Sequence, residues 1–203
     1  MYTVVSVCTL IAVYFFYKNK KIDNTKIIVY GAGFPSFFYY LGHLSKNELL
    51  KYETIQGYSS GVLVIICILS DIKLSEVILL ANQCIGESNE LKGVERIENI
   101  IRLFIYKILY KFPEEYKSKV EVITTDLKKM RPNIKKLSEV SEDQIGNLIF
   151  SSCSVPYITS SRFSRFIDGG LLYWMMPNTI SAKTKRFIRN PFKILTESEA
   201  YYY

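Results

Sequence analysis

Histidine is almost absent from this sequence: His43 is the single histidine among 203 residues. Enzymes that pair a serine nucleophile with a histidine base place the two in a defined order, and in the α/β hydrolases the histidine follows the serine. No histidine follows residue 43, so any serine further along the chain that acts as a nucleophile needs a different general base. We interpret His43 as an ordinary helix residue that faces core or solvent.

Cysteine is also scarce, and its four copies show no C-x-x-C spacing. This argues against both a zinc site and a disulfide framework. Three of the cysteines lie inside apolar runs, and the fourth lies in an uncharged N-terminal stretch. We expect free, buried thiols in a reducing compartment. The four residues are Cys8, Cys67, Cys84 and Cys153.

Acidic residues are too few to balance the basic ones, and the formal net charge is +7. A positive excess attracts anionic partners. The lysines are scattered and no aromatic-basic nucleic-acid motif accompanies them, so we favour an anionic membrane surface as the partner and no nucleic acid. A basic, solvated surface without such a partner is the alternative.

The N-terminus carries an uncharged stretch from Tyr2 to Tyr17, followed at once by Lys18, Lys20 and Lys21. Sixteen residues are near the lower limit for crossing a bilayer, which takes about 17–25. No basic region precedes the stretch, so we predict an uncleaved membrane anchor over residues 1–21. The lysines that follow place the domain, residues 22–203, in the cytosol. A buried N-terminal strand or helix is the alternative.

Beyond residue 22, predicted strands and helices alternate without repeats or low-complexity segments. Nearly half of the residues are hydrophobic, enough for one domain with a sizeable core. Alternation of this kind predicts an α/β fold with a mostly parallel sheet and helices on both faces. We expect strands near residues 27–30, 52–56, 120–125 and 164–167, and helices near 37–44, 62–69, 73–85, 94–112 and from 141 to about 154.

The sequence Gly57-Tyr58-Ser59-Ser60-Gly61 joins an expected strand to a long apolar run. G-x-S-x-G at a strand-to-helix turn lifts the middle serine onto a strained corner with its hydroxyl exposed. Side chains at Gly57 and Gly61 would collide with the neighbouring helix and strand. Ser59 is therefore the candidate nucleophile, although short glycine-serine patterns also occur in loops by chance.

A second glycine loop, Gly31-Ala32-Gly33-Phe34, follows the first expected strand and precedes a helix. The first N–H groups of a helix lack intrahelical partners and lie at the positive end of its dipole. Beside a serine at a strand-to-helix corner of the G-x-S-x-G type, called an elbow below, such a loop is suited to an oxyanion hole. A dinucleotide site is the competing interpretation, but the third glycine of G-x-G-x-x-G is missing.

Asp168 ends the last expected strand and is followed by Gly169 and Gly170. The carboxyl ends of parallel strands share one edge of a sheet, so Ser59 and Asp168 are expected to meet in a crevice there. The two glycines allow close backbone approach and unusual dihedral angles. Asp168 is the candidate general base; an ordinary turn is the alternative.

These three motifs, in this order and without a triad histidine, resemble the patatin-like phospholipases, and most closely their adipose-lipase and adiponutrin branch. Gly42 in the helix after the glycine loop agrees with that branch. Two supporting stretches agree with the family, Thr124-Thr125-Asp126-Leu127 and Ser151-Ser152-Cys153-Ser154-Val155-Pro156. The resemblance covers roughly residues 27 to 178.

The resemblance implies a three-layer α/β/α fold and a Ser59–Asp168 dyad, with Asp168 accepting the serine proton. Amides of the glycine loop would hold the oxyanion, and the substrate would be an acyl ester of a phospholipid or other glycerolipid. The reaction would be hydrolysis through an acyl-serine intermediate. Neither a metal nor an organic cofactor is implied.

The glycine loop departs from the family pattern at Pro35 and Ser36, where a basic residue and a glycine are usual. Pro35 has no N–H to donate. A catalytically inactive, membrane-anchored lipid-binding or interaction protein that keeps the fold is therefore the alternative function. A non-lipid esterase or transacylase with the same dyad is a third.

Overall fold

A computed structural model describes residues 25–31 and 33–170. The predicted membrane anchor over residues 1–21 lies outside these ranges, as do Cys8 and Ala32. Between residues 25 and 170, the structure has the following order: β1 (Lys26–Val29), α2 (Gly33–His43), α3 (Lys46–Leu49), β2 (Thr54–Gly57), α4 (Ser60–Leu69), α5 (Leu74–Glu87), α6 (Gly93–Leu109), η1 (Glu114–Tyr116), β3 (Val120–Asp126), β4 (Arg131–Lys136), η2 (Leu137–Glu139), α7 (Glu142–Ser152) and β5 (Phe166–Asp168).

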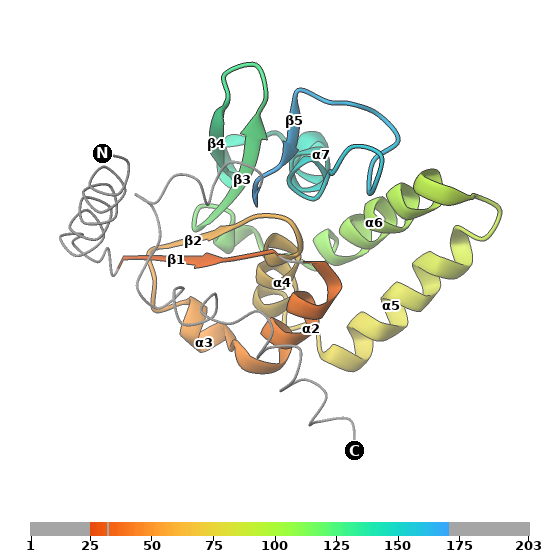
Figure 1. Cartoon of the computed structure of the whole chain (residues 1–203). Coiled ribbons are helices and arrows are strands. Elements are labelled where there is room, and N and C mark those ends of the chain that lie inside the picture. The colour runs from red at the N-terminus through yellow and green to blue at the C-terminus, as the bar shows by residue number, and fades with distance from the viewer. Residues whose placement is uncertain (1–24, 32, 171–203) are drawn as a thin grey trace, which may run out of the picture.

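The chain forms a mixed α/β fold around a mostly parallel sheet, as its alternating pattern predicts (Figure 1). Strands β1, β2 and β3 are parallel neighbours. Both β4 and β5 pair with β3 in the antiparallel sense. The antiparallel direction of β5 differs from the expectation for the last strand, and it matters for the site below.

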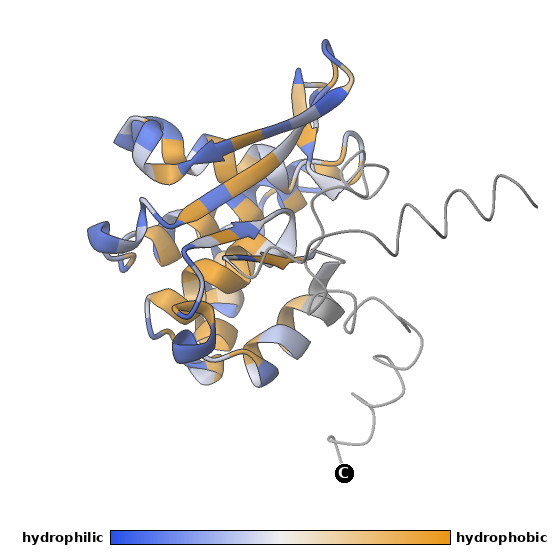
Figure 2. Cartoon of the chain, turned by 90° about the vertical axis from the view of Figure 1, so that its left-hand side faces the viewer, coloured by the Kyte–Doolittle hydropathy of each residue, from blue (hydrophilic) through white to orange (hydrophobic). Residues whose placement is uncertain are grey.

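The apolar alternation of the strands divides the core into two parts. Ile27 and Val29 of β1 belong to the large cluster shared with α2 and α4–α7, whereas Ile28 points to the opposite face. That opposite face carries a small buried cluster of Ile28, Tyr30, Tyr58 and Ile123. Figure 2 shows apolar residues concentrated in the interior strands and helices and hydrophilic ones at the outer loops.

Helix α4 is the central helix of this core because it lacks a polar face. Eight of its ten residues are buried, and no charged residue occurs in it. A helix that is apolar all round must be enclosed by other elements. Its first residue follows the elbow serine, so the most deeply packed helix of the domain carries the candidate nucleophile at its start.

Several expected elements differ in detail from the observed ones. Ser141 does precede α7, but its side chain makes no capping hydrogen bond. The short helix α3 and strand β4 were not expected; β4 reads Arg-Pro-Asn-Ile-Lys-Lys, a polar edge strand without an apolar signal. Within the part of the chain that the structure describes, no helix is long and apolar enough to cross a bilayer.

Candidate active site

Ser59 lies on a sharp corner between β2 and α4, as expected for G-x-S-x-G. Its backbone has φ 51° and ψ −138°, a conformation that residues with a Cβ rarely adopt. Strain of this kind costs about 1–3 kcal/mol and persists only where the surroundings enforce it. The enforcing contacts are therefore part of the site.

The two glycines of the elbow are required by close packing. A Cβ on Gly61 would lie 2.2 Å from the carbonyl oxygen of Val29, and one on Gly57 would lie 2.6 Å from Cδ1 of Ile65. The expected collisions with a neighbouring strand and helix are thus confirmed. A side chain at Gly61 would have to displace the backbone of β1, and one at Gly57 would have to displace the Ile65 side chain and crowd the Val62 backbone at 3.0 Å.

The glycine loop after β1 lies directly against the elbow. A Cβ on Gly31 would lie 2.4 Å from Cβ of Ser59. Gly33 begins α2 with φ 78°, a conformation suited to glycine, and lines the same pocket as Ser59. Phe34 contributes its backbone to the first turn of α2. The structure therefore brings Gly31 and Gly33 to Ser59, and the oxyanion role of the loop stays a prediction.

Asp168 reaches the same corner from the opposite direction. Because β5 runs antiparallel to β3, the expectation that Asp168 ends a parallel strand is wrong. The strand is short and stops with Asp168 opposite Thr124. Strand β4 occupies one side of β3, so β2 and β5 both pair along its other side. Gly57 lies opposite Val122 there, so the corner that follows Gly57 is level with the end of β5.

The Ser59 hydroxyl lies close enough to the Asp168 carboxyl to influence its pKa. Burial raises the pKa of the Asp168 carboxyl above its ordinary value, while the Ser59 hydroxyl and the amide of Gly170 oppose that rise. The Gly170 amide lies 2.8 Å from Oδ1. A partly desolvated carboxylate close to a serine hydroxyl is a chemically suitable proton acceptor.

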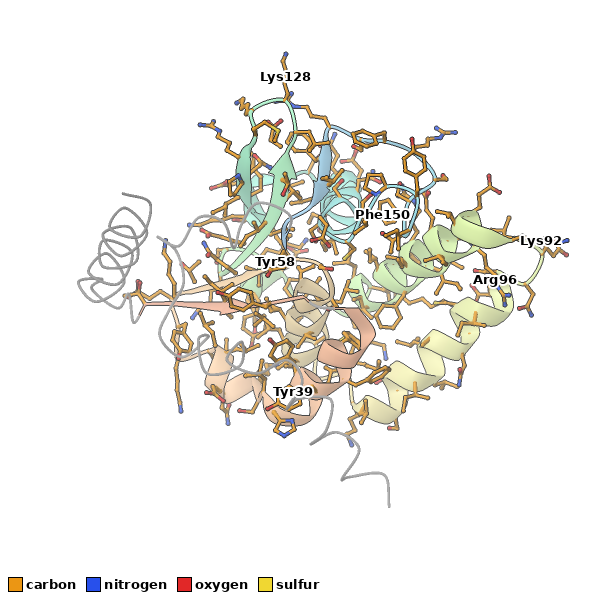
Figure 3. The ribbon with its side chains drawn as sticks, viewed as in Figure 1. Tyr39, Tyr58, Lys92, Arg96, Lys128 and Phe150 are labelled. Carbon is orange, nitrogen blue, oxygen red and sulfur yellow. The ribbon has the colours of Figure 1, made fainter. Side chains whose placement is uncertain are left out.

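Gly169 and Gly170 pack against Tyr58, the residue before the candidate nucleophile. A Cβ on Gly169 would lie 2.2 Å from the carbonyl oxygen of Ile123, and one on Gly170 would lie 2.7 Å from Cε2 of Tyr58. Neither glycine has a positive φ, so space and not dihedral freedom explains them. Figure 3 shows Tyr58 near the centre of the molecule, below the end of β5.

Ser152 and Ser154, to which the sequence assigned no individual role, bind the backbone of both dyad residues. The amide of Ser59 donates to the carbonyl of Ser152 at 2.9 Å, and the amide of Asp168 donates to the carbonyl of Ser154 at 2.8 Å. The end of α7 thereby fixes both candidate residues. In the sequence, these two serines stood out only as part of the Ser151–Pro156 stretch. That stretch indicated a family resemblance, but not that its carbonyls would bind the amides of Ser59 and Asp168.

An ion pair joins Arg165, the residue before β5, to Asp126, the last residue of β3. Arg165 donates to the Asp126 carboxylate through Nη2 at 2.7 Å and Nε at 3.1 Å. The guanidinium is the main cause that lowers the pKa of Asp126 to about 2. A bidentate pair of this geometry is directional. It therefore supports the register that puts Asp168 opposite Thr124.

Cys153 is a second nucleophilic side chain near Ser59, but its chemistry is unfavourable. Burial raises the pKa of its thiol strongly, and the charge of Asp168 adds to this. A neutral thiol is a poor nucleophile. Cys67, Cys84 and Cys153 are all free and buried, which confirms the expectation for the cysteines that the structure describes.

An apolar pocket of about 210 Å³ opens beside Ser59. Its walls come from α2, α4, α5 and α6, and Ser59 and Ser60 belong to its lining. The sequence did not single out these wall residues, since they look like ordinary helix-core positions. The apolar side chains are Phe37, Phe38, Leu63, Val77, Ala81, Ile85, Ile100, Ile101 and Phe104.

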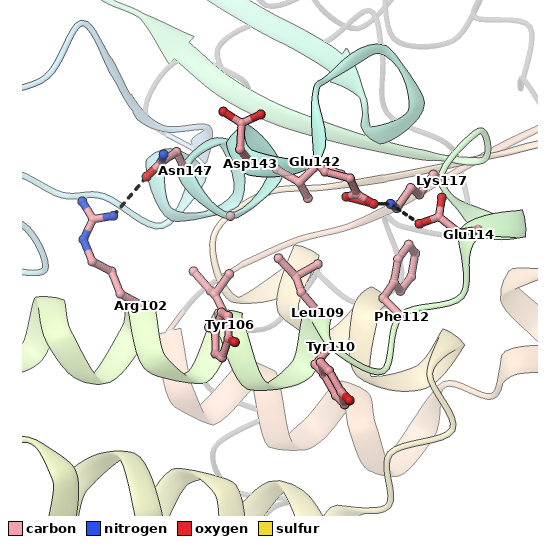
Figure 4. A pocket seen from close by; sticks show the side chains of 13 residues that line it. Arg102, Tyr106, Leu109, Tyr110, Phe112, Glu114, Lys117, Glu142, Asp143 and Asn147 are labelled. Carbon is pink, nitrogen blue, oxygen red and sulfur yellow. Dashed lines mark hydrogen bonds and ion pairs between the residues drawn. The ribbon is translucent and has the colours of Figure 1, made fainter.

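A larger cavity of about 580 Å³ lies between α6 and α7 (Figure 4). Its polar side chains are mostly engaged with each other: Lys117 pairs with Glu114 and Glu142, and Arg102 donates to Asn147. Ser59 lines the smaller pocket and not this cavity, and Asp168 lines neither of the two. We therefore assign the chemistry to the smaller pocket.

His43 lies exposed at the C-terminal end of α2, where its ring stacks on Tyr39 at 4.1 Å between centroids and its Nδ1 donates to the Tyr39 carbonyl. It is a helix residue, as expected. Among the residues from 25 to 170 that are described, no group of three or more His, Cys, Asp or Glu side chains could hold a metal ion.

Comparison with known proteins assigns the chain to no family. No protein-family model matches the chain, and no curated protein has a significantly similar sequence.

Proposed function

We propose that this protein is a lipid acyl hydrolase that uses Ser59 as nucleophile and Asp168 as general base. The observation that carries the proposal is the proximity of the Ser59 hydroxyl to the Asp168 carboxyl at a strained corner. Supporting it, the corner opens into an apolar pocket suited to one acyl chain. The proposed substrate is a phospholipid or another acylglycerol.

In the acylation step, the Ser59 hydroxyl transfers its proton to Asp168 while Oγ forms a bond to the ester carbonyl carbon. The carbonyl oxygen becomes an oxyanion. When this intermediate collapses, the bond to the alcohol oxygen breaks and Asp168 returns the proton to the leaving alcohol. The products are the acyl-Ser59 ester and the free alcohol of the lipid.

In the deacylation step, a water molecule takes the place of the alcohol. Asp168 accepts one proton from the water as its oxygen attacks the acyl carbon, and then gives that proton to Oγ of Ser59. The fatty acid leaves and the serine is restored. One aspartate thus acts as base and acid in turn, which matches the absence of a histidine after residue 43.

The oxyanion is proposed to bind to amides of the Gly31–Phe34 loop. In favour of this role, Gly31 approaches Ser59 so closely that a Cβ there would collide with it. Donors preorganised toward the developing charge contribute about 3–4 kcal/mol in other acyl-transfer enzymes. Pro35, in the first turn of α2, supplies no N–H, so the donors must precede it.

The motif order further supports a patatin-like assignment, with a three-layer α/β/α arrangement and an N-terminal anchor over residues 1–21. In that arrangement the domain faces the cytosol and an anionic membrane surface. An anchor would hold the site near its substrate at high effective concentration.

An inactive lipid-binding protein is the second candidate, because Pro35 reduces the donors available to the oxyanion. The two are separated by turnover of a fluorogenic medium-chain ester and of phospholipid vesicles by the purified full chain. The hydrolase predicts turnover that falls by about 10³-fold or more in Ser59→Ala, the scale seen when a nucleophile is removed. A comparable fall is expected in Asp168→Asn.

Matched controls come from exposed residues of the same types. Ser138→Ala and Asp143→Asn change a serine and an aspartate outside the pocket and should keep wild-type turnover. Equal turnover in all five proteins rejects the hydrolase. Binding of lipid without turnover in the wild type supports the inactive candidate.

A further inference from the structure

Exposed apolar side chains form a stripe along α5. Leu74, Ile78 and Ile85 are 44%, 46% and 43% exposed, and together with Ala81 they follow the spacing i, i+4, i+7, i+11. Residues at this spacing share one face of a helix. Single exposed apolar residues are common on protein surfaces, but a contiguous row marks an interaction surface.

The stripe is continuous with the pocket beside Ser59. Ala81 and Ile85 belong both to the stripe and to the pocket wall. Phe38 of α2 also lines the pocket and is 36% exposed. The exposed face and the interior of the pocket are therefore one apolar surface that ends at Ser59.

The carboxylates of α5 that form ion pairs lie on the side of the helix away from this face. Glu76 of α5 forms an ion pair with Lys111, and Glu87 pairs with Lys107 of α6 at 2.9 Å. The face itself carries no charged residue at its four α5 positions. This favours contact with an apolar layer over attraction to a highly charged partner.

We propose that Leu74, Ile78, Ile85 and Phe38 form a docking face for a phospholipid bilayer at the boundary between headgroups and acyl chains. An acyl chain would then pass from the bilayer into the pocket without crossing water. A protein partner on the same face would block the pocket entrance, which is why a lipid surface fits better. The inference rests on the proposed function, since it takes the pocket as the acyl site.

The test uses the full chain with Ser59→Ala, so that chemistry plays no part, and Cys8→Ser, so that only the buried native thiols remain. Ile78→Cys carries an environment-sensitive NBD fluorophore. The matched control is Ile134→Cys on β4, an isoleucine of similar exposure (38%) on a strand that contributes nothing to the pocket. Labelling sites are checked by mass spectrometry and folding by circular dichroism.

Adding phosphatidylcholine vesicles should shift the emission at position 78 to the blue and raise it several-fold, with quenching by nitroxide-bearing lipid and no change at position 134. The shift should persist at about 1 M NaCl, where the Debye length is about 3 Å. A local probe reports this face even if residues 1–21 anchor the protein.

Three results overturn the proposal. Equal responses at positions 78 and 134 mean that the face does not enter lipid. A blue-shifted probe before vesicles are added means that another part of the chain or a second copy covers the face. Loss of the shift at high salt means electrostatic docking. If the wild type turns over substrate but one of these three results is found, the docking proposal fails and the proposed hydrolase function stands. If the face enters lipid but the wild type shows no turnover, the hydrolase function fails and the docking proposal stands.

Discussion

Ser59 and Asp168 are held by one segment at the end of α7. The amide of Ser59 bonds the carbonyl of Ser152 and the amide of Asp168 bonds the carbonyl of Ser154, at 2.9 and 2.8 Å. The two residues are 109 positions apart in the chain, yet their relative placement depends on a turn of three residues. The alignment of the dyad should therefore be sensitive to this turn.

Thr159 braces that turn, since its hydroxyl donates to the Cys153 carbonyl and accepts from the Val155 amide, both at 2.7 Å. Thr159→Val keeps the shape but removes both bonds, at a cost of about 1–3 kcal/mol of unfolding free energy. We expect kcat to fall about tenfold or more, because small displacements of reacting groups are costly, with KM little changed. Thr159→Ser should restore kcat; if it does not, the bracing role is wrong.

Phe104 forms part of the pocket wall and is only 8% exposed. Phe104→Leu should enlarge the pocket and move the preference among p-nitrophenyl esters toward longer acyl chains, measured as kcat/KM against chain length. Phe112→Leu is the matched control, a phenylalanine of equal exposure outside this pocket. An unchanged profile in Phe104→Leu, or the same change in both variants, contradicts the acyl assignment.

The raised pKa of Asp168 predicts an acidic limb in the pH profile. Its carboxyl must be ionised to accept the Ser59 proton, so kcat/KM should fall as pH decreases through a pKa above the ordinary aspartate value of about 3.9. Burial is the main cause of the rise. A profile measured with a soluble ester should show this single ionisation, and a limb at or below the ordinary value would contradict the burial of the base.

Asp126 has the opposite shift and predicts a stability effect. Its pKa in the folded state is lowered to about 2, so it stabilises the fold above its unfolded-state pKa, near 4, and loses that contribution as pH falls toward 2. Arg165→Ala should lower Tm at pH 7, and the difference from wild type should shrink between pH 4 and 2. Arg162→Ala, a change at another exposed arginine of the same loop, should leave Tm nearly unchanged at both pH values.

The sequence was sufficient to predict features that depend on local chemistry. The elbow at Ser59 follows from two glycines that close packing demands, and the α/β class follows from alternating apolar runs. The direction of β5 was not predictable, because Phe166–Asp168 is too short to reveal its partner or its sense. Ser152 and Ser154 act through their backbone carbonyls. Every residue type has such a carbonyl, so the sequence could not indicate these roles.

The pocket was also beyond prediction. Phe37, Val77 and Phe104 have the spacing of ordinary core residues, and only the packing of α2, α5 and α6 against one another makes them the wall of a pocket. Exposure of Ile78 and Ile85 depends on the same packing. Tertiary arrangement, not helix periodicity, decides which apolar residues line a cavity.

The most direct test of the central claim is covalent labelling of the full chain by a fluorophosphonate, with the modified residue located by mass spectrometry. The account predicts a label on Ser59 alone, lost in Ser59→Ala and strongly slowed in Asp168→Asn, but retained in His43→Ala. A wild-type protein that takes no label, or one whose labelling is unchanged in Ser59→Ala, would contradict it.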